Sequence, residues 1–431
     1  MELKDPSEVP WENLHPGDHV RIYWRSEPYR TKFVLCRRGS VERPIVVQGV
    51  SGPGGALPVI DGRDAVTRKL LNFWGEDRAV IKIGGANRPA DTTPAHLIIR
   101  GLEIRSARRP YSFTGRSGRT SYRKNAASIY IEKGENILIE NCRLRDSGNG
   151  IITGPATRDL TVRGCYLFDN GVERSLYEHN AYIYALGVTF EYNRFGPLRT
   201  GCLGNNFKDR SAGLRFICNW VEGGSRCVDL VDASDPRISK DPRYSRAEVL
   251  GNVLIKSPTS GNNQVVHFGG DSGKAAQYRK ELIFAHNTVV SSRRGNTVLF
   301  RRSHAGAKLV CVNNLAYVTP EVGRLSLLND VNVRECRFDG NWFSRGWRIS
   351  PGSGSQTLPR GGNLSGIDPG FLDVSGLDLR LAGGSSAIGV GRVGTQTAGF
   401  ATQYRIHQRS APRGDLAGGG RPDIGAFSDH R

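Results

Sequence analysis

A short segment of alternating apolar and polar residues that ends in Asn or Gly recurs along this chain, and it constrains the fold more than any other feature. The copies end at Gly101, Asn141, Gly164, Asn193, Asn219, Asn252, Asn287, Asn314 and Asn341. Successive copies are 23 to 40 residues apart, which indicates one short structural unit with insertions of variable length. Such a unit cannot bury its apolar face alone, so the units must stack into a solenoid.

Each unit is built from strands rather than helices. The segments alternate with period 2, whereas a helical repeat requires a period of 3.6 residues. A leucine-rich repeat requires regularly placed Leu, but here Val, Ile, Phe and Leu share the apolar positions. The recurring Asn or Gly fits a turn in the left-handed region, and stacked Asn side chains can form a hydrogen-bonded ladder. The pattern therefore predicts an all-β fold, a parallel β-helix.

We expect one domain over residues 1–431. Residues 1–93 are predicted to form an N-terminal cap and the first rungs, and residues 94–345 the regular rungs. Residues 346–431 lose the period and are predicted to form a C-terminal cap with loops, with possible last strands in 377–391 and 421–427. A cap is required because an uncovered last rung would expose a sheet edge.

The composition narrows the class of partner. The formal net charge is +19, which fits either a basic, soluble surface or an anionic partner. No nucleic-acid-binding signature occurs, so we expect an acidic polysaccharide and no nucleic acid. No run of 18 apolar residues occurs, so we expect no membrane span. The eight Cys form no CxxC pair, so we expect no zinc site. We expect the thiols to be mostly reduced and structural. We also expect the protein to be a monomer.

Polar residues recur at one position of the repeat. Counting back eleven residues from the repeat residue gives Tyr130, Thr153, Tyr182 and Lys208. Their neighbours, such as Ile129 and Ile183, are apolar, so alternation turns this position outward. For the next two repeats, alternation alone places Asp229 and His267 in the same column. We expect these side chains to stack on one outer face at the spacing of strands, about 4.8 Å.

This outer face carries our candidate functional residues. The candidate catalytic residues are Lys208, Tyr182, His179, Arg210, His267 and Asp229. The candidate substrate-binding residues are Asn180, Asn206, Tyr184, Tyr130 and Asp232. Lys208 and Asp229 could instead form an ordinary ion pair between rungs, which contributes little when exposed. As a group, however, these residue types are those of a catalytic centre.

The chain also resembles a known family. The resemblance lies in His179-Asn180-Ala181-Tyr182, in Lys208-Asp209-Arg210 one rung on, and in the acidic segment from Asp229 to Asp232. With the opening PGDHVRIYW and the closing RPDIGAF, these segments resemble bacterial secreted proteins of the pectin-lyase-like superfamily. The resemblance implies a right-handed parallel β-helix of the polysaccharide-lyase type. It also implies a secreted or periplasmic location, although the N-terminus is polar and does not look like a signal peptide.

Three functions remain open at this point. A uronate lyase needs a group that neutralises the sugar carboxylate, a base and an acid. Arg210 with Asn180 or Asn206 could hold the carboxylate, Lys208 or a histidine could be the base, and Tyr182 the acid. A glycoside hydrolase needs two carboxylates, for which Asp229, Asp232, Asp209 and Glu178 are candidates.

The third function is a glycan-binding or tailspike-like module with Tyr130, Tyr182 and Tyr184 as an aromatic platform. We favour the lyase because the face holds more cationic, Tyr and His groups than paired acids. No cofactor is predicted; calcium is compatible with the family, but no acidic cluster in the sequence identifies a site for it.

Overall fold

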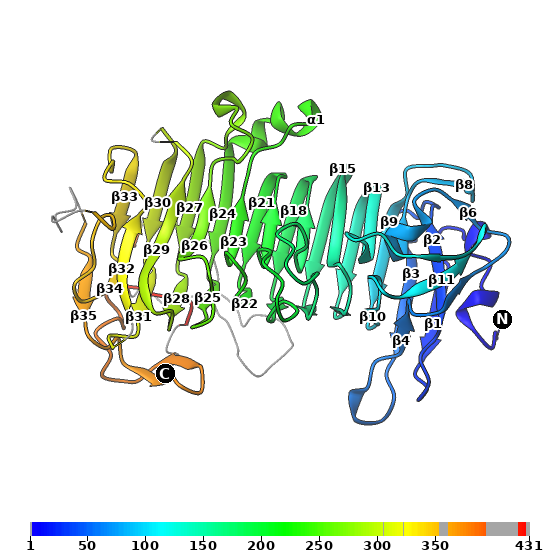
Figure 1. Cartoon of the computed structure of the whole chain (residues 1–431), viewed down its shortest axis with the longest axis horizontal. Helices are drawn as coiled ribbons and strands as arrows, with labels where there is room; N and C mark the ends of the chain where they lie inside the picture. Colours follow the sequence, from blue (N-terminus) through cyan, green and yellow to red (C-terminus); the bar gives the residue numbers. More distant parts are fainter. Residues whose placement is uncertain (1, 305, 322, 353–360, 394–420, 428–431) are drawn as a thin grey trace. The chain divides into compact units, whose positions relative to one another are not determined.

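Strands dominate the computed structural model of the chain, which describes residues 2–304, 306–321, 323–352, 361–393 and 421–427 (Figure 1). The chain divides into two compact units. Unit 1 comprises Met1–Thr189 and Asn193–Ser211, and unit 2 comprises Phe190–Tyr192 and Ala212–Arg431. Each unit is a stack of parallel strands, so the predicted fold class, an all-β parallel β-helix, is confirmed.

Unit 1 has three faces of parallel strands. The first contains β1 (His19–Tyr23), β3 (Ile45–Val50), β9 (Ala95–Arg100) and the second halves of β13 (Ala127–Glu140) and β15 (Asn149–Arg163). The second contains β4 (Val59–Asp61), β10 (Glu103–Arg105), β14 (Arg143–Arg145), β16 (Tyr166–Phe168) and β19 (Arg194–Phe195). The third contains β2 (Thr31–Leu35), β7 (Ala79–Ile83), the first halves of β13 and β15, β17 (Ala181–Ile183) and β20 (Phe207–Asp209).

Further short strands of unit 1 lie in its loops. They are β5 (Ala65–Thr67), β6 (Asn72–Phe73), β8 (Ala86–Arg88), β11 (Ser112–Gly115) and β12 (Gly118–Ser121). Strand β18 (Ala185–Glu191) begins in unit 1 and ends in unit 2.

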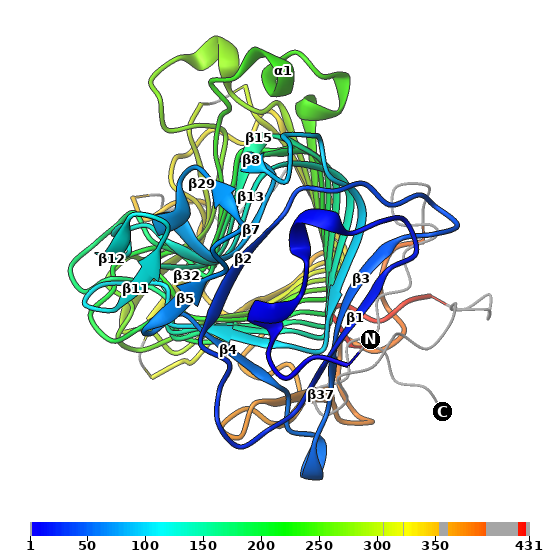
Figure 2. The same ribbon diagram turned by 90° about the vertical axis from the view of Figure 1, so that its right-hand side faces the viewer.

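The first coil of unit 1 is covered by the N-terminal residues. Two 3₁₀ turns, Pro6–Glu8 and Trp11–Asn13, lie across the end of the coil formed by β1, β2, β3 and β4 (Figure 2). The Trp11 ring is fully buried and stacks on Phe33 with ring centroids 3.9 Å apart. This segment hides the apolar end of the first rung, as expected of an N-terminal cap.

Unit 2 also has three faces. The first contains β21 (Ala212–Ile217), β24 (Arg246–Leu250), β27 (Glu281–Ala285), β30 (Lys308–Val312) and β33 (Cys336–Asp339), side by side in Figure 1. The second contains β22 (Trp220–Glu222), β25 (Val253–Lys256), β28 (Thr288–Ser291), β31 (Leu315–Val318), β34 (Trp342–Ser344) and β35 (Leu364–Gly366). The third contains β23 (Val228–Leu230), β26 (Gln264–Phe268), β29 (Gly295–Arg302) and β32 (Gly323–Leu328). A short helix, α1 (Pro236–Ser239), lies in the loop after β23.

A buried asparagine ladder runs through unit 2. Its members are Asn219, Asn252, Asn287, Asn314, Asn341 and Asn363. In each step the backbone N–H and the side-chain Nδ2 of one Asn donate to Oδ1 of the next, for example 2.9 Å for both bonds from Asn252 to Asn287. The ladder that the repeat predicted is therefore present. It provides hydrogen-bond partners for the buried backbone groups at the turn between the first two faces of each rung.

The left-handed residue of the turn differs from our expectation in unit 2. There the residue before each ladder Asn has a positive φ: Cys218, Gly251, His286, Asn313, Gly340 and Gly362. The Asn side chain must point into the ladder, so the preceding residue makes the bend. In unit 1, by contrast, Gly101, Asn141 and Gly164 are themselves left-handed, as predicted.

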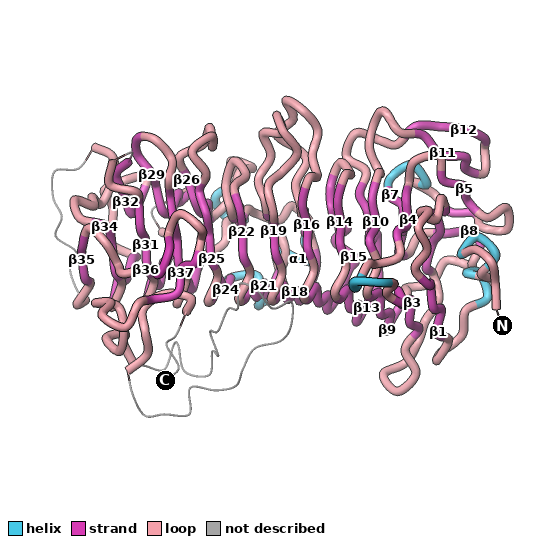
Figure 3. The backbone as a smooth tube through the Cα atoms, turned by 90° about the horizontal axis from the view of Figure 1, so that it is seen from below, coloured by secondary structure: helices cyan, strands magenta, loops and turns pink. Residues whose placement is uncertain are grey.

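The described part of the C-terminal region packs on the side of unit 2. Strands β36 (Phe371–Asp373) and β37 (Asp378–Leu381) form a hairpin near β31, where Phe371 contacts Tyr317 at 5.9 Å between ring centroids (Figure 3). Residues 421–427 form no strand, contrary to our expectation. Instead Gly425 N–H donates to Asn313 O, and Ile424 is buried against the second face. The predicted cap over 346–431 lies partly outside the described residues.

All eight cysteines are free thiols, and six of them are buried. Burial raises the pKa of Cys227 and of Cys336 to about 11, so both thiols are protonated at neutral pH. Among the described residues, no helix has the length and apolar character that crossing a membrane requires.

The ladder gives a first testable prediction. Asn287→Ala removes the carbonyl that receives two bonds from Asn252 and the amide that donates to Val249 O. Each buried polar group left without a partner costs about 1–3 kcal/mol, so we expect a loss of about 3 kcal/mol in unfolding free energy. Urea unfolding followed by circular dichroism measures it. The exposed Asn87→Ala should change stability by less than about 0.5 kcal/mol; equal effects of both substitutions would contradict a structural role of the ladder.

Candidate active site

The third face of unit 1 carries a column of side chains in register. Val34 pairs with Lys82, Lys82 with Tyr130, Tyr130 with Ile152, Ile152 with Tyr182, and Tyr182 with Lys208. The predicted neighbours Tyr182 and Lys208 therefore lie on adjacent rungs, in β17 and β20. Both side chains are partly exposed, unlike the buried residues that flank them. The expected step from Lys208 to Asp229 joins residues of different units and stays a prediction.

Thr153 does not belong to this column, contrary to our expectation. Thr153 pairs with Ile131, and Ile152 takes the column position. The register between β13 and β15 shifts after Ile131, where β15 holds one extra residue. This β-bulge lengthens the count back from Gly164 by one. Thr153 instead accepts a hydrogen bond from the backbone N–H of Tyr184 at 2.7 Å.

Arg210 fixes the position of the Tyr182 phenol. Its Nε donates to Tyr182 Oη at 3.0 Å, and its backbone N–H donates to Ile183 O at 2.8 Å. Arg210 directly follows β20, two residues after Lys208, so alternation places both cations on the same side of the strand. The face thus brings a phenol, an amine and a guanidinium together on two rungs. The partly exposed Tyr184 lies two residues after Tyr182, at the edge of this group.

Asn180 and Asn206 point into the protein, contrary to the outward placement that we expected. Both are fully buried and belong to a short ladder in which Asn170 Nδ2 donates to Asn180 Oδ1, and Asn180 Nδ2 donates to Asn206 Oδ1 at 2.8 Å. Both amides also donate to Gly196 O. Asn is among the few residues that satisfy an inner turn in this way, so these two side chains stabilise the corner of the coil and cannot hold a substrate carboxylate.

His179 is buried as well, with 2% of its surface exposed. Its Nδ1 lies 3.0 Å from the backbone N of Asn205 and 3.1 Å from Asn205 O. The ring meets Tyr182 edge-on with centroids 5.6 Å apart. The His179 ring is therefore buried next to the Tyr182 ring and is not exposed on the outer face.

Lys82 and Tyr130 extend the column toward the N-terminus. The Lys82 amine is buried, and it binds Glu132 at 2.8 Å, Trp74 O at 2.7 Å and Gly85 O at 2.8 Å. Tyr130 lies under the Arg78 guanidinium, 4.6 Å from the ring centroid, and burial raises the pKa of its phenol. Sequence reasoning missed Lys82 because AVIKIGG precedes the regular repeat. Because Glu132, Trp74 and Gly85 already bind the Lys82 amine, we assign Lys82 a structural role beside the site.

In unit 2, Asp229 and His267 pair in register, as alternation predicted. Their side chains are joined by a bond of 2.7 Å between Asp229 Oδ1 and His267 Nδ1. Both are almost fully buried, which differs from the predicted open face. Arg226 contacts Asp229 at 3.4 Å, and Ser303, which follows β29, contacts His267 at 2.8 Å.

Asp232 holds the loop after β26. Its Oδ1 accepts the backbone N–H groups of Asp271 at 2.7 Å and Ser272 at 3.2 Å, and its Oδ2 accepts the Ser272 hydroxyl. The carboxylate is 1% exposed. Asp232 therefore anchors the loop, and its role in substrate binding stays a prediction.

Sequence reasoning also missed Ser303 and Arg301. Arg301 pairs with His267 in register and is exposed. Ser303 follows β29 directly, and its Oγ lies 2.8 Å from His267 Nε2. The only signal in the sequence is the segment NTVLFRR, whose alternation would place Arg301 beside His267.

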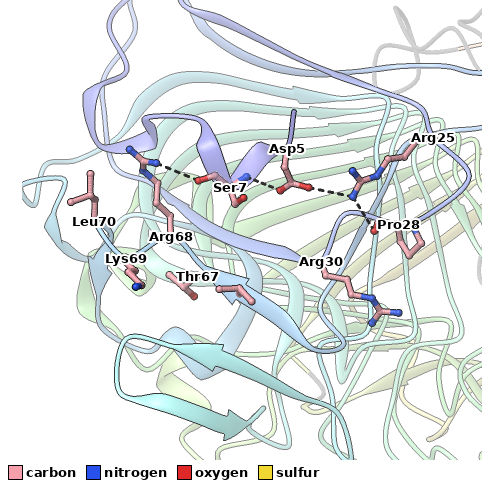
Figure 4. Close-up of a pocket in the computed structure, with 10 residues that line it drawn as sticks. Asp5, Ser7, Arg25, Pro28, Arg30, Thr67, Arg68, Lys69 and Leu70 are labelled. Atoms are coloured by element: carbon pink, nitrogen blue, oxygen red, sulfur yellow. Dashed lines mark hydrogen bonds and ion pairs between the residues drawn. The ribbon is translucent and has the colours of Figure 1, made fainter. Parts of the chain in front are cut away.

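A pocket of about 580 Å³ lies near the N-terminus of unit 1, and none of the predicted site residues lines it (Figure 4). Arg68 and Arg25 line it, but protein groups hold both: Arg68 binds Glu12 and Ser7 O, and Arg25 binds Asp5. We therefore do not take it as the active site. Among the described residues, no group of three or more His, Cys, Asp or Glu side chains could hold a metal ion, so no step is assigned to calcium.

No family model matches the chain, and no curated protein matches it. Three solved structures of polysaccharide lyases are similar to it at TM-scores below 0.5. An alginate lyase from Paenibacillus sp. str. FPU-7 is 13% identical over 74% of this chain and 95% of its own, with a TM-score of 0.41. A pectate lyase is 12% identical over 97% and 90%, with a TM-score of 0.45. A rhamnogalacturonan lyase is 14% identical over 77% and 81%, with a TM-score of 0.49.

A buried lysine outside the column gives a prediction about pH. Lys32 is fully buried between Phe113 and Tyr122, and burial lowers the pKa of its amine to about 7. In the unfolded chain a Lys has a pKa of about 10.4. Between pH 7 and about pH 10.4, position 32 therefore binds more protons in the unfolded chain than in the folded protein. Stability must therefore rise with pH across this window, by on the order of 5 kcal/mol.

Lys32→Met should remove this rise and should stabilise the protein below pH 7. Urea unfolding at a series of pH values measures both effects, with the exposed Lys124→Met as the control. A rise of unchanged size in Lys32→Met would show that other groups cause it.

Proposed function

We propose that this protein is a polysaccharide lyase that cleaves an acidic, uronic-acid-containing polymer by β-elimination. The observation that carries the proposal is the register of Tyr182 and Lys208 on adjacent rungs, with Arg210 bonded to the Tyr182 phenol at 3.0 Å. These groups are an amine, a phenol and a guanidinium, which are the kinds of group that elimination from a uronate needs. We propose that it acts outside the cytoplasm, where such polymers occur.

The reaction breaks the C–O bond at C4 of the uronate and forms a C4–C5 double bond. Arg210 neutralises the carboxylate and so makes the C5 proton more acidic. The Lys208 amine removes that proton as the general base, and the electron pair of the C5–H bond becomes the new double bond. The Tyr182 phenol gives its proton to the leaving oxygen. The net charge of +19 favours the approach of an anionic polymer.

The same geometry gives less support to a glycoside hydrolase. Asp209 is fully buried and accepts the backbone N–H of Ser211 at 3.1 Å, while Asp232 binds its loop. Glu178 is buried too, and burial raises its pKa. A hydrolase needs two carboxyl groups that reach the same glycosidic bond, roughly 5 Å or 6.5–9.5 Å apart. Asp209 and Glu178 are buried in unit 1 and so do not stand on its outer face with Tyr182 and Lys208, while Asp229 and Asp232 are buried in unit 2.

Products distinguish the two reactions. With a panel of uronate polymers, elimination gives products that absorb in the ultraviolet because they contain the conjugated double bond. Hydrolysis gives new reducing ends without that absorbance. Reducing ends alone would contradict the lyase assignment, and binding without any product would favour a glycan-binding module.

The role of Lys208 is tested by Lys208→Ala. Removal of a general base costs about 10²- to 10⁴-fold in rate, so formation of the unsaturated product should fall by at least about 100-fold. The far-ultraviolet β signal should be unchanged, because the side chain is partly exposed. Lys124→Ala, an exposed lysine of the same unit, is the matched control. Full activity of Lys208→Ala would refute the assignment.

The role of Tyr182 is tested by Tyr182→Phe, which keeps the ring and removes the proton donor. We expect kcat to fall by about 10²- to 10⁴-fold while KM changes little, because the phenol acts in the transition state. A rise in KM at unchanged kcat would instead show that Tyr182 only binds the sugar.

A further inference from the structure

Three residues of unit 2 form a hydrogen-bonded series that the elimination does not require. Asp229 Oδ1 lies 2.7 Å from His267 Nδ1, and His267 Nε2 lies 2.8 Å from Ser303 Oγ. Asp229 is on β23 and His267 on β26, with their Cα atoms in register, and Ser303 directly follows β29. The distances are those of a working nucleophile, base and orienting acid. Arg226 donates to the same Asp229 oxygen at 3.4 Å.

We propose that Ser303, His267 and Asp229 form a second catalytic centre, which hydrolyses ester bonds by acyl transfer. Asp229 accepts the Nδ1–H of His267 and so directs the lone pair of Nε2 toward Ser303. Burial of Asp229 and His267 keeps this orientation, with 1% and 3% of their surfaces exposed. Ser303 itself is partly exposed.

The reaction proceeds in two balanced steps. In the first, Ser303 Oγ attacks the ester carbonyl carbon while its proton passes to His267 Nε2. The bond from that carbon to the alcohol oxygen breaks, and the alcohol leaves with the proton from Nε2. In the second, water attacks the acyl-serine, its proton passes through Nε2 to Ser303 Oγ, and the acid is released.

The loop after β26 positions the Ser303 hydroxyl. Gly270 N–H donates to Ser303 Oγ at 3.0 Å. Gly270 O also lies 2.6 Å from Oγ, but a peptide carbonyl cannot take a proton in the reaction, whereas an imidazole can. Close approach of the loop needs glycine, because a Cβ on Gly269, whose φ is 129°, would lie 2.8 Å from Ser303 Cβ.

Arg301 indicates the class of ester. Its Cα pairs with His267, its side chain is exposed, and among the described residues it forms no hydrogen bond or ion pair. A guanidinium on the face beside the nucleophile would attract a carboxylate. The ester would therefore be an O-acyl group on an acidic saccharide. The catalytic centre itself stands on the contacts of unit 2, whereas the choice of a saccharide as the acyl carrier rests on the proposed function.

The test uses the full chain and two probes. The purified protein should hydrolyse p-nitrophenyl acetate, and a fluorophosphonate probe should label the peptide that contains Ser303, as read by mass spectrometry. Ser303→Ala and His267→Asn should each lower the hydrolysis rate by at least about 100-fold. Ser292→Ala, whose hydroxyl also lies near a backbone carbonyl, Lys256 O at 3.4 Å, should leave it unchanged.

Labelling of the wild-type protein needs no substitution, so a variant that fails to fold cannot obscure the result. A label on any other residue, no label and no turnover, or full activity in Ser303→Ala would each overturn the proposal. If the centre works as proposed, acetylated uronate oligosaccharides should release acetate faster than acetylated neutral ones, and Arg301→Gln should remove that difference.

Discussion

The buried asparagine ladder is the interaction on which unit 2 depends. A coil that turns sharply leaves backbone N–H and C=O groups pointing inward at every corner, and no water is available there to satisfy them. Each ladder Asn accepts from the residue one rung before it and donates to the residue one rung after it, as Asn252 and Asn287 do. The ladder thus fixes the height of each rung relative to the next. Unit 1 uses the same device at another corner, from Asn170 through Asn180 to Asn206.

A fixed rung height makes a reactive surface from residues far apart in the sequence. Tyr182 and Lys208 are 26 positions apart, yet they are direct neighbours because Asn180 and Asn206 hold the corner just before their strands. Asn180 and Asn206 therefore support the site from inside. The same principle brings Asp229, His267 and Ser303 into series on the third face of unit 2. Both proposed centres therefore depend on rungs that are held at a fixed height.

Much of this could be predicted from the sequence because the repeat carries it. The recurring Asn predicts the ladder, and the alternation with period 2 predicts which side chains share a face. Together they predict that Tyr182 neighbours Lys208 and that Asp229 neighbours His267. What could not be predicted depends on departures from the repeat. The extra residue of β15 moves Thr153 out of the column, and no residue type in that segment announces a bulge.

Burial was also beyond the sequence. Alternation shows which way a side chain points but not what covers it, so Asp229 and His267 were expected on an open face. In the structure both are buried, with Arg226 against Asp229 and Ser303 against His267. Asn180 and Asn206 were misplaced for a different reason. The sequence shows only that Asn180 and Asn206 are polar residues next to a strand, which fits a functional role. The structure shows that their side-chain amides belong to an internal ladder.

A crystal structure of Lys208→Ala with a uronate oligosaccharide would show whether an acidic sugar binds over Tyr182, residue 208 and Arg210. We expect the carboxylate to contact the Arg210 guanidinium, the ring to lie against Tyr182, and C5–H to face position 208. A sugar bound elsewhere, such as in the pocket lined by Asp5 and Arg68, or bound here with its carboxylate turned away from Arg210, would contradict this expectation.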